Sequence, residues 1–443
     1  MIEQNCTHSR TPWYRYITVE PTMFLYMMAF MITNVVEQTF YVFRACTVDH
    51  GYSEEICYNI TSYKEINEEV QVMYLTVTVS TFHQWNGVAS HIVPLCLAFF
   101  LGSYSDKRGR KSILLAGLLG KLYFSIVITL NTMKDWPLHY VIYTATFPSA
   151  LTGADLAIFA GAFAYIADVT SSDNRTLRVG ILDAVYLSTM SLGVFIGKQN
   201  VVNRSFTAMF TINATLMLLA TLHCLFCLDW QTRPEQRSLR DAGVNNPIAD
   251  FFDAKNIKQT MLTLTKRRSS NRTLFLWFLL ISMALYTFQR DERPFMYLYV
   301  QNVFQWDTTA YSNFRTYLSA AYVLTMFIAI PLMTKAFHWK DTVSYIKDHS
   351  NKRTATSWKL LYVGGASAAL GPCVAPLVRS MTSKILPPAE RGQYKAICDV
   401  MRNFDSMYAF IFDYVKKEKN VSNIFINLHD GLIIEIVIIP FIK

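Results

Sequence analysis

The chain has 443 residues, of which 52% are hydrophobic and only 16% are charged. Soluble domains carry about 25% charged residues, and the apolar residues here come in blocks that reach the length of about 20 residues needed to cross a bilayer. The formal net charge of +9 comes from Lys and Arg that cluster between these blocks, as they do in the cytosolic loops of membrane proteins. The composition therefore predicts an all-α membrane protein and argues against a nucleic-acid partner.

Six candidate spans occupy the first half of the chain, after a cytosolic N-terminal segment at residues 1–20. The predicted spans are 21–43, 85–104, 112–132, a stretch within 140–167, 177–197 and 206–228. The acidic segment 45–84 is expected outside the cell or in a lumen, whereas the basic segments 107–111 and 168–178 are expected in the cytosol. We therefore expect residues 21–228 to form one six-helix half.

A hydrophilic connector follows at residues 229–272, with more basic than acidic residues and no apolar block of spanning length. Apolar blocks resume at 273–288, 312–333 and 358–378, and beyond them the pattern weakens. Residues 273–443 are thus expected to form a second, incomplete helical half. Two helical halves joined in this way are typical of secondary transporters, although the spacing alone also fits other polytopic proteins.

The acidic outer segment contains two cysteines and a glycosylation signal. Cys46 and Cys57 both lie where oxidation can persist, so we predict a disulfide between them. Asn59 opens the sequon Asn-Ile-Thr in the same segment and is a candidate for glycosylation. Both features favour the secretory route, and with it the plasma membrane or an endolysosomal membrane.

A glycine-rich basic motif separates the second and third predicted spans. It reads Gly102-Ser-Tyr-Ser-Asp106-Lys-Arg-Gly109-Arg110-Lys111 and resembles the G-x-x-x-D-x-x-G-R-[RK] signature of the major facilitator superfamily. The resemblance implies a two-half helical bundle. Gly102 permits close helix packing and Gly109 a tight turn, while Asp106 can sit near a helix N-terminus or pair with an arginine. We interpret the motif as a conformational latch; a solvated turn with ordinary cytosolic charges is the alternative.

The loop after the fourth predicted span is similar to that of one branch of this superfamily. Residues 164–178, which include Asp168, Arg175 and Arg178, resemble the solute carrier 46 family, whose members include the proton-coupled folate transporter. The resemblance covers roughly residues 20–400 and implies a secondary transporter for a small organic solute, such as a folate-like anion, coupled to protons.

The chain departs from that family in its second half. Residues 335–357 are hydrophilic where a ninth span is expected, and no convincing twelfth span closes the chain. An incomplete or alternatively spliced coding sequence explains this departure, and a functional eleven-span variant is the other reading. A non-transporting receptor-like or truncated regulatory form therefore remains an alternative to the transporter.

Ionisable residues within the predicted spans are candidates for function because burying a charge in a membrane is costly. Asp155 and Lys121 could line a central cavity and bind the substrate, or could pair with each other. Glu37, near the outer end of the first span, could reach water.

Asp183, in the inner half of the fifth span, corresponds to a glutamate that the resemblance links to proton coupling, and it is the leading candidate for that role here. A structural pairing with Arg175 or Arg178 is the alternative. Arg379, at the end of the block 358–378, corresponds to an arginine that the resemblance links to substrate and proton binding, and its alternative role is that of a cytosolic anchor.

No enzymatic motif emerges from the sequence. Nucleophile elbows, phosphate-binding loops and zinc-ligand spacings are missing from it. We therefore predict neither an enzyme nor a cofactor or metal site, and without a nucleotide-binding loop the transport would be secondary. The expected partners are a small organic solute, protons and the lipid bilayer.

Overall fold

A computed structural model of the chain describes residues 17–61, 69–171, 174–202, 206–237, 241, 243, 246–266, 272–290 and 308–331, together with residues 362, 378, 381 and 382. In chain order the helices are α1 Glu20–Arg44, the π-helical turn η2 Ala45–Asp49, α2 Glu54–Thr61, α3 Glu69–Arg108, α4 Arg110–Thr132, the π-helical turn η3 Ile142–Thr146, α5 Phe147–Ala150, α6 Ala154–Val169, α7 Arg175–Val202, α8 Phe206–Cys227, α9 Pro247–Phe251, α10 Ala254–Thr265, α11 Arg272–Arg290 and α13 Thr308–Pro331. The described part contains helices and no strands, which confirms the all-α prediction.

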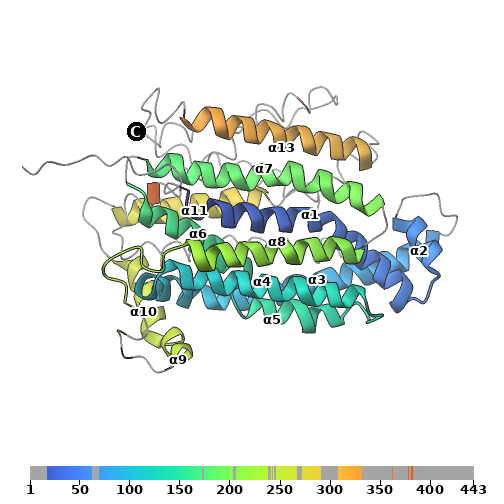
Figure 1. Cartoon of the computed structure of the whole chain (residues 1–443), viewed down its shortest axis with the longest axis horizontal. Coiled ribbons are helices and arrows are strands. Elements are labelled where there is room, and N and C mark those ends of the chain that lie inside the picture. Colours follow the sequence, from blue (N-terminus) through green and yellow to red (C-terminus); the bar gives the residue numbers. More distant parts are fainter. Residues whose placement is uncertain are drawn as a thin grey trace, which may run out of the picture.

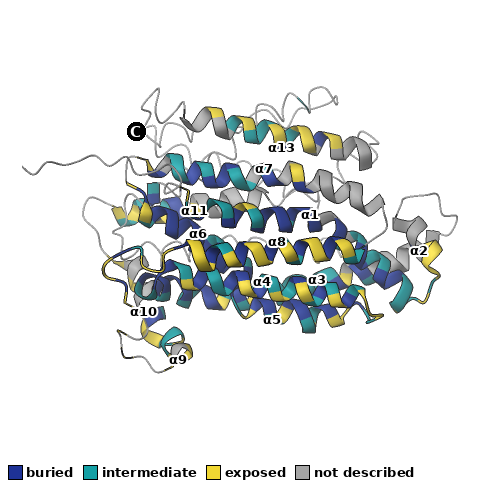
Figure 2. Cartoon of the chain, in the orientation of Figure 1, coloured by how far each residue is buried: buried dark blue, intermediate teal, exposed yellow. Residues whose placement is uncertain are grey.

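The long helices run side by side along the longest axis of the molecule (Figure 1). Helix α1 packs against α7 and α8, and α4 packs against α6 and α8. Two glycines allow this closeness: a side chain at Gly193 of α7 would collide with Met31 of α1, and one at Gly161 of α6 would press on Leu114 of α4. The buried faces of the helices point toward one another, and exposed residues line the outer side of α8 (Figure 2).

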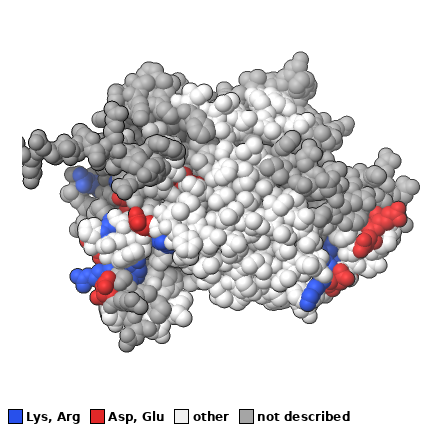
Figure 3. All heavy atoms as spheres, viewed as in Figure 1, with Lys and Arg blue, Asp and Glu red and all other residues white. Residues whose placement is uncertain are grey.

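Four of the described segments are long and apolar enough to cross a membrane: 81–108, 110–132, 142–169 and 206–227. They match the predicted second, third, fourth and sixth spans. Lys, Arg, Asp and Glu gather at the two ends of the visible face, and the broad middle carries almost none (Figure 3). This distribution fits a bundle whose middle lies in hydrocarbon and whose ends lie in water.

Two helices differ from the sequence-based boundaries. Helix α3 begins at Glu69, well before the predicted span at 85–104, so part of the acidic outer segment is helical. The fourth span is not continuous: it breaks at Gly153, which has φ +82°, before α6 begins. Interrupted helices are typical of transporter binding sites, because the break brings backbone dipoles to the middle of the membrane.

The outer end of the bundle is cross-linked by the predicted disulfide. Cys46 of η2 and Cys57 of α2 are bonded, with their Cα atoms 5.8 Å apart. Nearby, Arg44 Nη1 lies 3.0 Å from Asp135 Oδ1 and Arg44 Nη2 donates to the Asn131 carbonyl. Asn59 lies within α2, and its glycosylation remains a prediction.

Several predictions concern residues outside the described part of the chain. Arg379, the segment 335–357 that stands in place of a ninth span, and the C-terminal end are among them. The division into 21–228, 229–272 and 273–443 also remains a prediction.

Candidate functional site

The glycine-rich motif makes the turn between α3 and α4. Gly109 has φ +99° and donates its N–H to the Ser105 carbonyl. A Cβ atom at this position would collide with the backbone carbonyl of Trp230, which follows α8. Gly109 is therefore required twice, once by its own backbone conformation and once by the close approach of the connector.

Replacing Gly109 by Ala is expected to destabilise the protein by about 1–3 kcal/mol from backbone strain alone, with the Trp230 collision added. Thermal unfolding of the purified protein measures this effect. Gly243→Ala is the matched control, since Gly243 also has a positive φ of +64° but a Cβ atom added there would meet nothing within 4 Å. If the two variants lowered the unfolding temperature equally, the contact with Trp230 would not contribute to the need for glycine at position 109.

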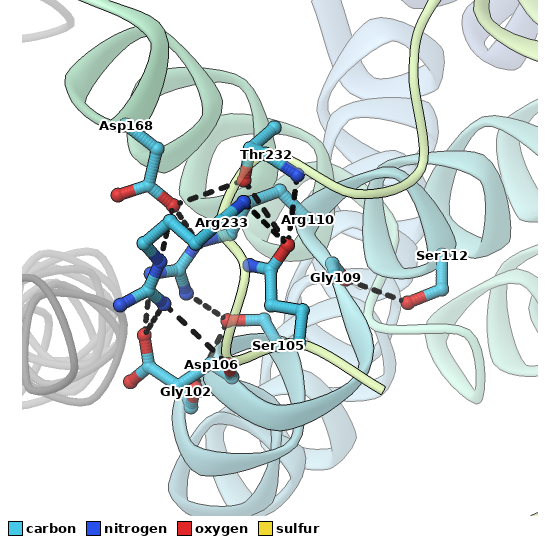
Figure 4. Close-up of polar contacts among 10 residues, drawn as sticks. Gly102, Ser105, Asp106, Gly109, Arg110, Ser112, Asp168, Thr232 and Arg233 are labelled. Atoms are coloured by element: carbon cyan, nitrogen blue, oxygen red, sulfur yellow. Dashed lines mark hydrogen bonds and ion pairs between the residues drawn. The ribbon is translucent and has the colours of Figure 1, made fainter. Parts of the chain in front are cut away.

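Four charged side chains form a buried cluster at this turn (Figure 4). Arg110 Nε donates to Asp168 Oδ2 at 2.9 Å, and Arg110 Nη2 donates to Asp106 Oδ1. Arg233 Nη2 lies 3.1 Å from Asp106 Oδ1, and its Nε lies 3.3 Å from Asp168 Oδ2. We call Asp106, Arg110, Asp168 and Arg233 the charge cluster. Two cations and two anions alternate in it, so each buried charge has opposite-charge neighbours.

The charge cluster joins four segments of the chain. Asp106 lies in the last turn of α3, Arg110 begins α4, Asp168 lies in the last turn of α6, and Arg233 follows α8. Arg110 is 0% exposed, as is the Asp168 side chain. The pairing of Asp106 with arginine is one of the two predicted alternatives, and burial rules out the solvated turn. Arg233 was missed by sequence reasoning because it resembles any other basic residue of the connector.

The remaining motif residues have separate roles. Lys111 Nζ donates to the carbonyls of Leu225 and Leu228 at the end of α8, where a cation is favourable. The Gly102 carbonyl accepts a hydrogen bond from Ser105 Oγ. Arg175 Nη2 donates to the Thr170 carbonyl.

A second group of charges lies within the membrane-spanning part. Lys121 Nζ of α4 is 2.8 Å from Asp155 Oδ2 of α6, which confirms the predicted possibility of a pair. The Tyr26 hydroxyl of α1 donates to Asp155 Oδ1. Asp155 lies in the first turn of α6, directly after the helix break, where the helix dipole favours an anion. The pair is nevertheless open, since the Asp155 side chain is 41% exposed and that of Lys121 is 18% exposed.

Glu37 belongs to the same group. Its carboxylate accepts a hydrogen bond from Tyr41 in the same helix, and the charges of Lys121 and Asp155 both act on it. Glu37 is half-buried, and its contact with water at the outer end remains a prediction. We call Glu37, Lys121 and Asp155 the membrane triad.

Asp183 lies in α7 and is 8% exposed. One of the two arginines proposed as its structural partners is engaged elsewhere: Arg178 Nη2 is 2.6 Å from Glu20 Oε1 and also donates to Thr18. A role for Asp183 in proton coupling remains a prediction.

The sequence profile of the Major Facilitator Superfamily matches residues 21–343. A probable peptidoglycan muropeptide transporter named SLC46 from Drosophila melanogaster is 22% identical over 412 residues, which are 87% of this chain and 76% of the relative. The lysosomal proton-coupled steroid conjugate and bile acid symporter SLC46A3 of Gallus gallus is 24% identical over 395 residues, covering 85% of this chain and 82% of the symporter.

The fold agrees with these relatives. The crystal structure of the human organic anion transporter MFSD10 superimposes with a TM-score of 0.65 at 13% identity, covering 89% of this chain and 92% of that protein. The signature turn, the interrupted fourth span and the sequence profile point to one conclusion. The two relatives above are solute carrier 46 proteins, and the chain belongs to the Major Facilitator Superfamily of multi-pass membrane transporters.

Proposed function

We propose that this chain moves a small organic anion together with protons, by alternating access between its two helical halves. The observation that carries the proposal is the membrane triad, in which the Lys121–Asp155 pair joins α4 to α6 at 2.8 Å and keeps Asp155 41% exposed. Charges within a span are costly and mark solute and proton pathways. A purely structural pair has no need of this exposure.

The geometry suggests how proton and anion binding are coupled. While Asp155 is ionised, it holds the Lys121 ammonium. Once Asp155 takes up a proton, the pair loses its anion, and a carboxylate or sulfate of the solute can replace it beside Lys121. Tyr26 holds the Asp155 side chain in place through Oδ1. Proton binding on one residue thus favours anion binding on the other.

The names of the relatives narrow the solute class. One relative is named as a probable muropeptide transporter and the other as a proton-coupled symporter of steroid conjugates and bile acids. The similar solved structure is that of an organic anion transporter. All of these solutes combine an acidic group with a larger body, and a folate-like anion fits the same class. The non-transporting alternative receives no support from relatives that are themselves named as transporters.

The charge cluster supplies the conformational latch in this proposal. It ties α3, α4, α6 and the segment after α8 at one end of the bundle. Such a cluster favours one state of the alternating cycle and must loosen when that end rearranges.

Uptake of a labelled bile acid, steroid sulfate, muropeptide and folate tests the proposal in cells that express the chain. Uptake is expected to rise at acidic pH. Asp183→Asn tests whether Asp183 contributes to proton coupling as a second carboxylate besides Asp155, and is expected to reduce this stimulation on the order of tenfold. Asp253→Asn is the matched control, because Asp253 caps α10 and Asn caps equally well. Acid-stimulated uptake that persists in Asp183→Asn would exclude Asp183 from proton coupling. Absence of uptake for all four solutes, with the protein at the membrane, would contradict the proposed class.

A further inference from the structure

The connector folds into two short helices that are fixed to the cytosolic end of α3. Asn246 caps α9, where its side chain accepts from Ile248 N and Ala249 N, and Asp253 caps α10 through Lys255 N. Helix α10 packs against α3. The amino-acid sequence marks this region only as hydrophilic, so its ordered attachment to a membrane-spanning helix is a finding of the structure.

Asp250 and Asn256 of the connector are hydrogen-bonded to side chains of α3. Arg108 Nε and Nη2 donate to the two carboxylate oxygens of Asp250 at 2.8 and 2.9 Å. Asn256 is 2% exposed, and its side-chain oxygen accepts from Lys107 Nζ at 2.8 Å and from Ser103 Oγ. The hydrogen bonds from Arg108 lower the pKa of Asp250 below its ordinary value of 3.8. The ion pair therefore stabilises the attachment at cytosolic pH and is lost only when the pH falls through that lowered pKa.

Aromatic contacts place α9 beside the membrane-spanning part of α3. The Phe251 ring lies 5.2 Å from Tyr104, and the Phe252 ring lies 5.2 Å from Phe100. Phe100 lies about 12 Å along the helix axis from Arg108, the last residue of α3, at a rise of 1.5 Å per residue. The connector therefore returns alongside α3, at the depth of the cytosolic membrane interface.

The connector packs on one face of α3 near its cytosolic end. Toward the other end of α3, the same face is exposed. Trp85 is 62% exposed and Ile92 is 47% exposed, and Cys96 is exposed as well. With Phe100 these residues recur at helical spacing on one face. An exposed apolar face on a spanning helix fits a contact with lipid, so α9 and α10 lie at the inner end of a candidate lipid-facing surface. Both helices project from the rest of the bundle (Figure 1).

The connector itself presents apolar and basic groups outward. Ile248 is 68% exposed and Phe252 is 53% exposed. Helix α10 carries two exposed lysines and an exposed leucine at spacings of three and four residues, and its C-cap residue is a third exposed lysine: Lys255, Lys258, Leu262 and Lys266. Asp253 is the acidic neighbour of these residues, 4.0 Å from Lys255. Apolar side chains beside a row of lysines are typical of helices that lie in a membrane interface.

We propose that α9 and α10 form a binding surface for anionic phospholipids of the cytosolic leaflet, with Ile248 and Phe252 in the boundary between headgroups and acyl chains and the three lysines on the headgroups. The cytosolic leaflet is the anionic one and attracts basic segments beside a span. The depth set by Phe100 favours a lipid over a soluble partner. The proposal rests on the membrane position of the chain, and it is independent of which solute is carried.

Hydrogen–deuterium exchange of residues 246–266 tests this surface in the full-length chain. The protein is placed in nanodiscs of phosphatidylcholine, with or without phosphatidylserine. Phosphatidylserine is expected to slow exchange in α10, with a contribution of about fivefold from each lysine. The variant Lys255→Gln/Lys258→Gln/Lys266→Gln is expected to lose this difference, while Lys134→Gln, an exposed lysine before Trp136 at the other end of the bundle, is expected to retain it.

Exchange rates that do not respond to phosphatidylserine in the unmodified chain would overturn the proposal. So would a response that survives in the triple variant. Ile248→Ser provides a second measurement, because Ile248 is 68% exposed and the variant keeps the Phe251 and Phe252 contacts with α3. It is expected to speed exchange in both nanodiscs, and unchanged exchange in that variant would exclude insertion of the Ile248 side chain. None of these measurements depends on uptake.

Discussion

Replacement of Arg110 by Met is expected to destabilise the protein by about 3–5 kcal/mol, because it leaves two buried carboxylates with one arginine between them. The Arg110 side chain is 0% exposed, and Asp106 and Asp168 are 5% and 0% exposed. Neither carboxylate can turn to water to recover its hydration. The expected result in cells is loss of the protein from its membrane, and in purified material a large drop in the unfolding temperature.

A double variant separates charge balance from local packing. Arg110→Met combined with Asp168→Asn removes one charge of each sign and leaves Asp106 paired with Arg233 at 3.1 Å. The double variant is expected to lose less unfolding free energy than the two single variants lose together. The difference, the coupling energy, is expected to be about 0.5–3 kcal/mol. Lys255→Gln is the control, since Lys255 is 82% exposed and 4.0 Å from Asp253, and such surface pairs contribute little. If the losses of unfolding free energy were strictly additive, the charge cluster would not act as a unit.

The parts of this site that depend on local sequence could be predicted. The turn at Gly109 and the pairing of Asp106 with an arginine follow from a motif of ten residues, 102–111. Arg110 reaches Asp106 because the tight turn at Gly109 keeps residues four apart in sequence close together in space. The disulfide between Cys46 and Cys57 could also be expected, since both lie in one short outer segment.

The contacts between distant segments could not be predicted in the same way. Asp168 and Arg233 join the charge cluster from α6 and from the segment after α8, and no local pattern states which of several basic residues will meet a given aspartate. The attachment of the connector to α3 is of the same kind, because Asp250 and Phe251 look like ordinary loop residues in sequence. The break at Gly153 had a local signal, a glycine within an apolar span, but glycines are also common in unbroken membrane helices.

The membrane triad shows how sequence alternatives can be joined in one structure. Lining a cavity and forming a pair were separate possibilities for Lys121 and Asp155. The structure pairs them at 2.8 Å and leaves Asp155 41% exposed, so one possibility does not exclude the other. Glu37 was expected to reach water because it lies near the end of a span, and its carboxylate accepts a hydrogen bond from Tyr41 of the same helix.

Lys121→Met is expected to raise the KM for the anionic solute by about 10–100-fold, since a hydrogen bond to a charged group contributes about 1.5–3 kcal/mol. It also leaves Asp155 without its cation. Because the Asp155 side chain is 41% exposed, the cost stays below the roughly 2.5–3.5 kcal/mol of a charge at the centre of a membrane helix. Asp155→Asn leaves Lys121 unpaired in the same way and is expected to abolish the acid stimulation of uptake. Both effects are measured by the dependence of the uptake rate on solute concentration and on pH, with the amount of protein at the cell surface measured in parallel.

The double variant Lys121→Met/Asp155→Asn decides between a structural and a transport role for the pair. Removing both charges together avoids an unpaired charge in the membrane, so the protein is expected to recover its unfolding temperature and its surface expression. Uptake is expected to stay lost, because the proposed anion-binding group and the proposed proton-accepting group are both gone. Lys134→Met is the control for loss of a lysine outside the span. If the double variant recovered acid-stimulated uptake along with its stability, the pair would be a helix contact, and the site of anion and proton binding would lie elsewhere in the chain.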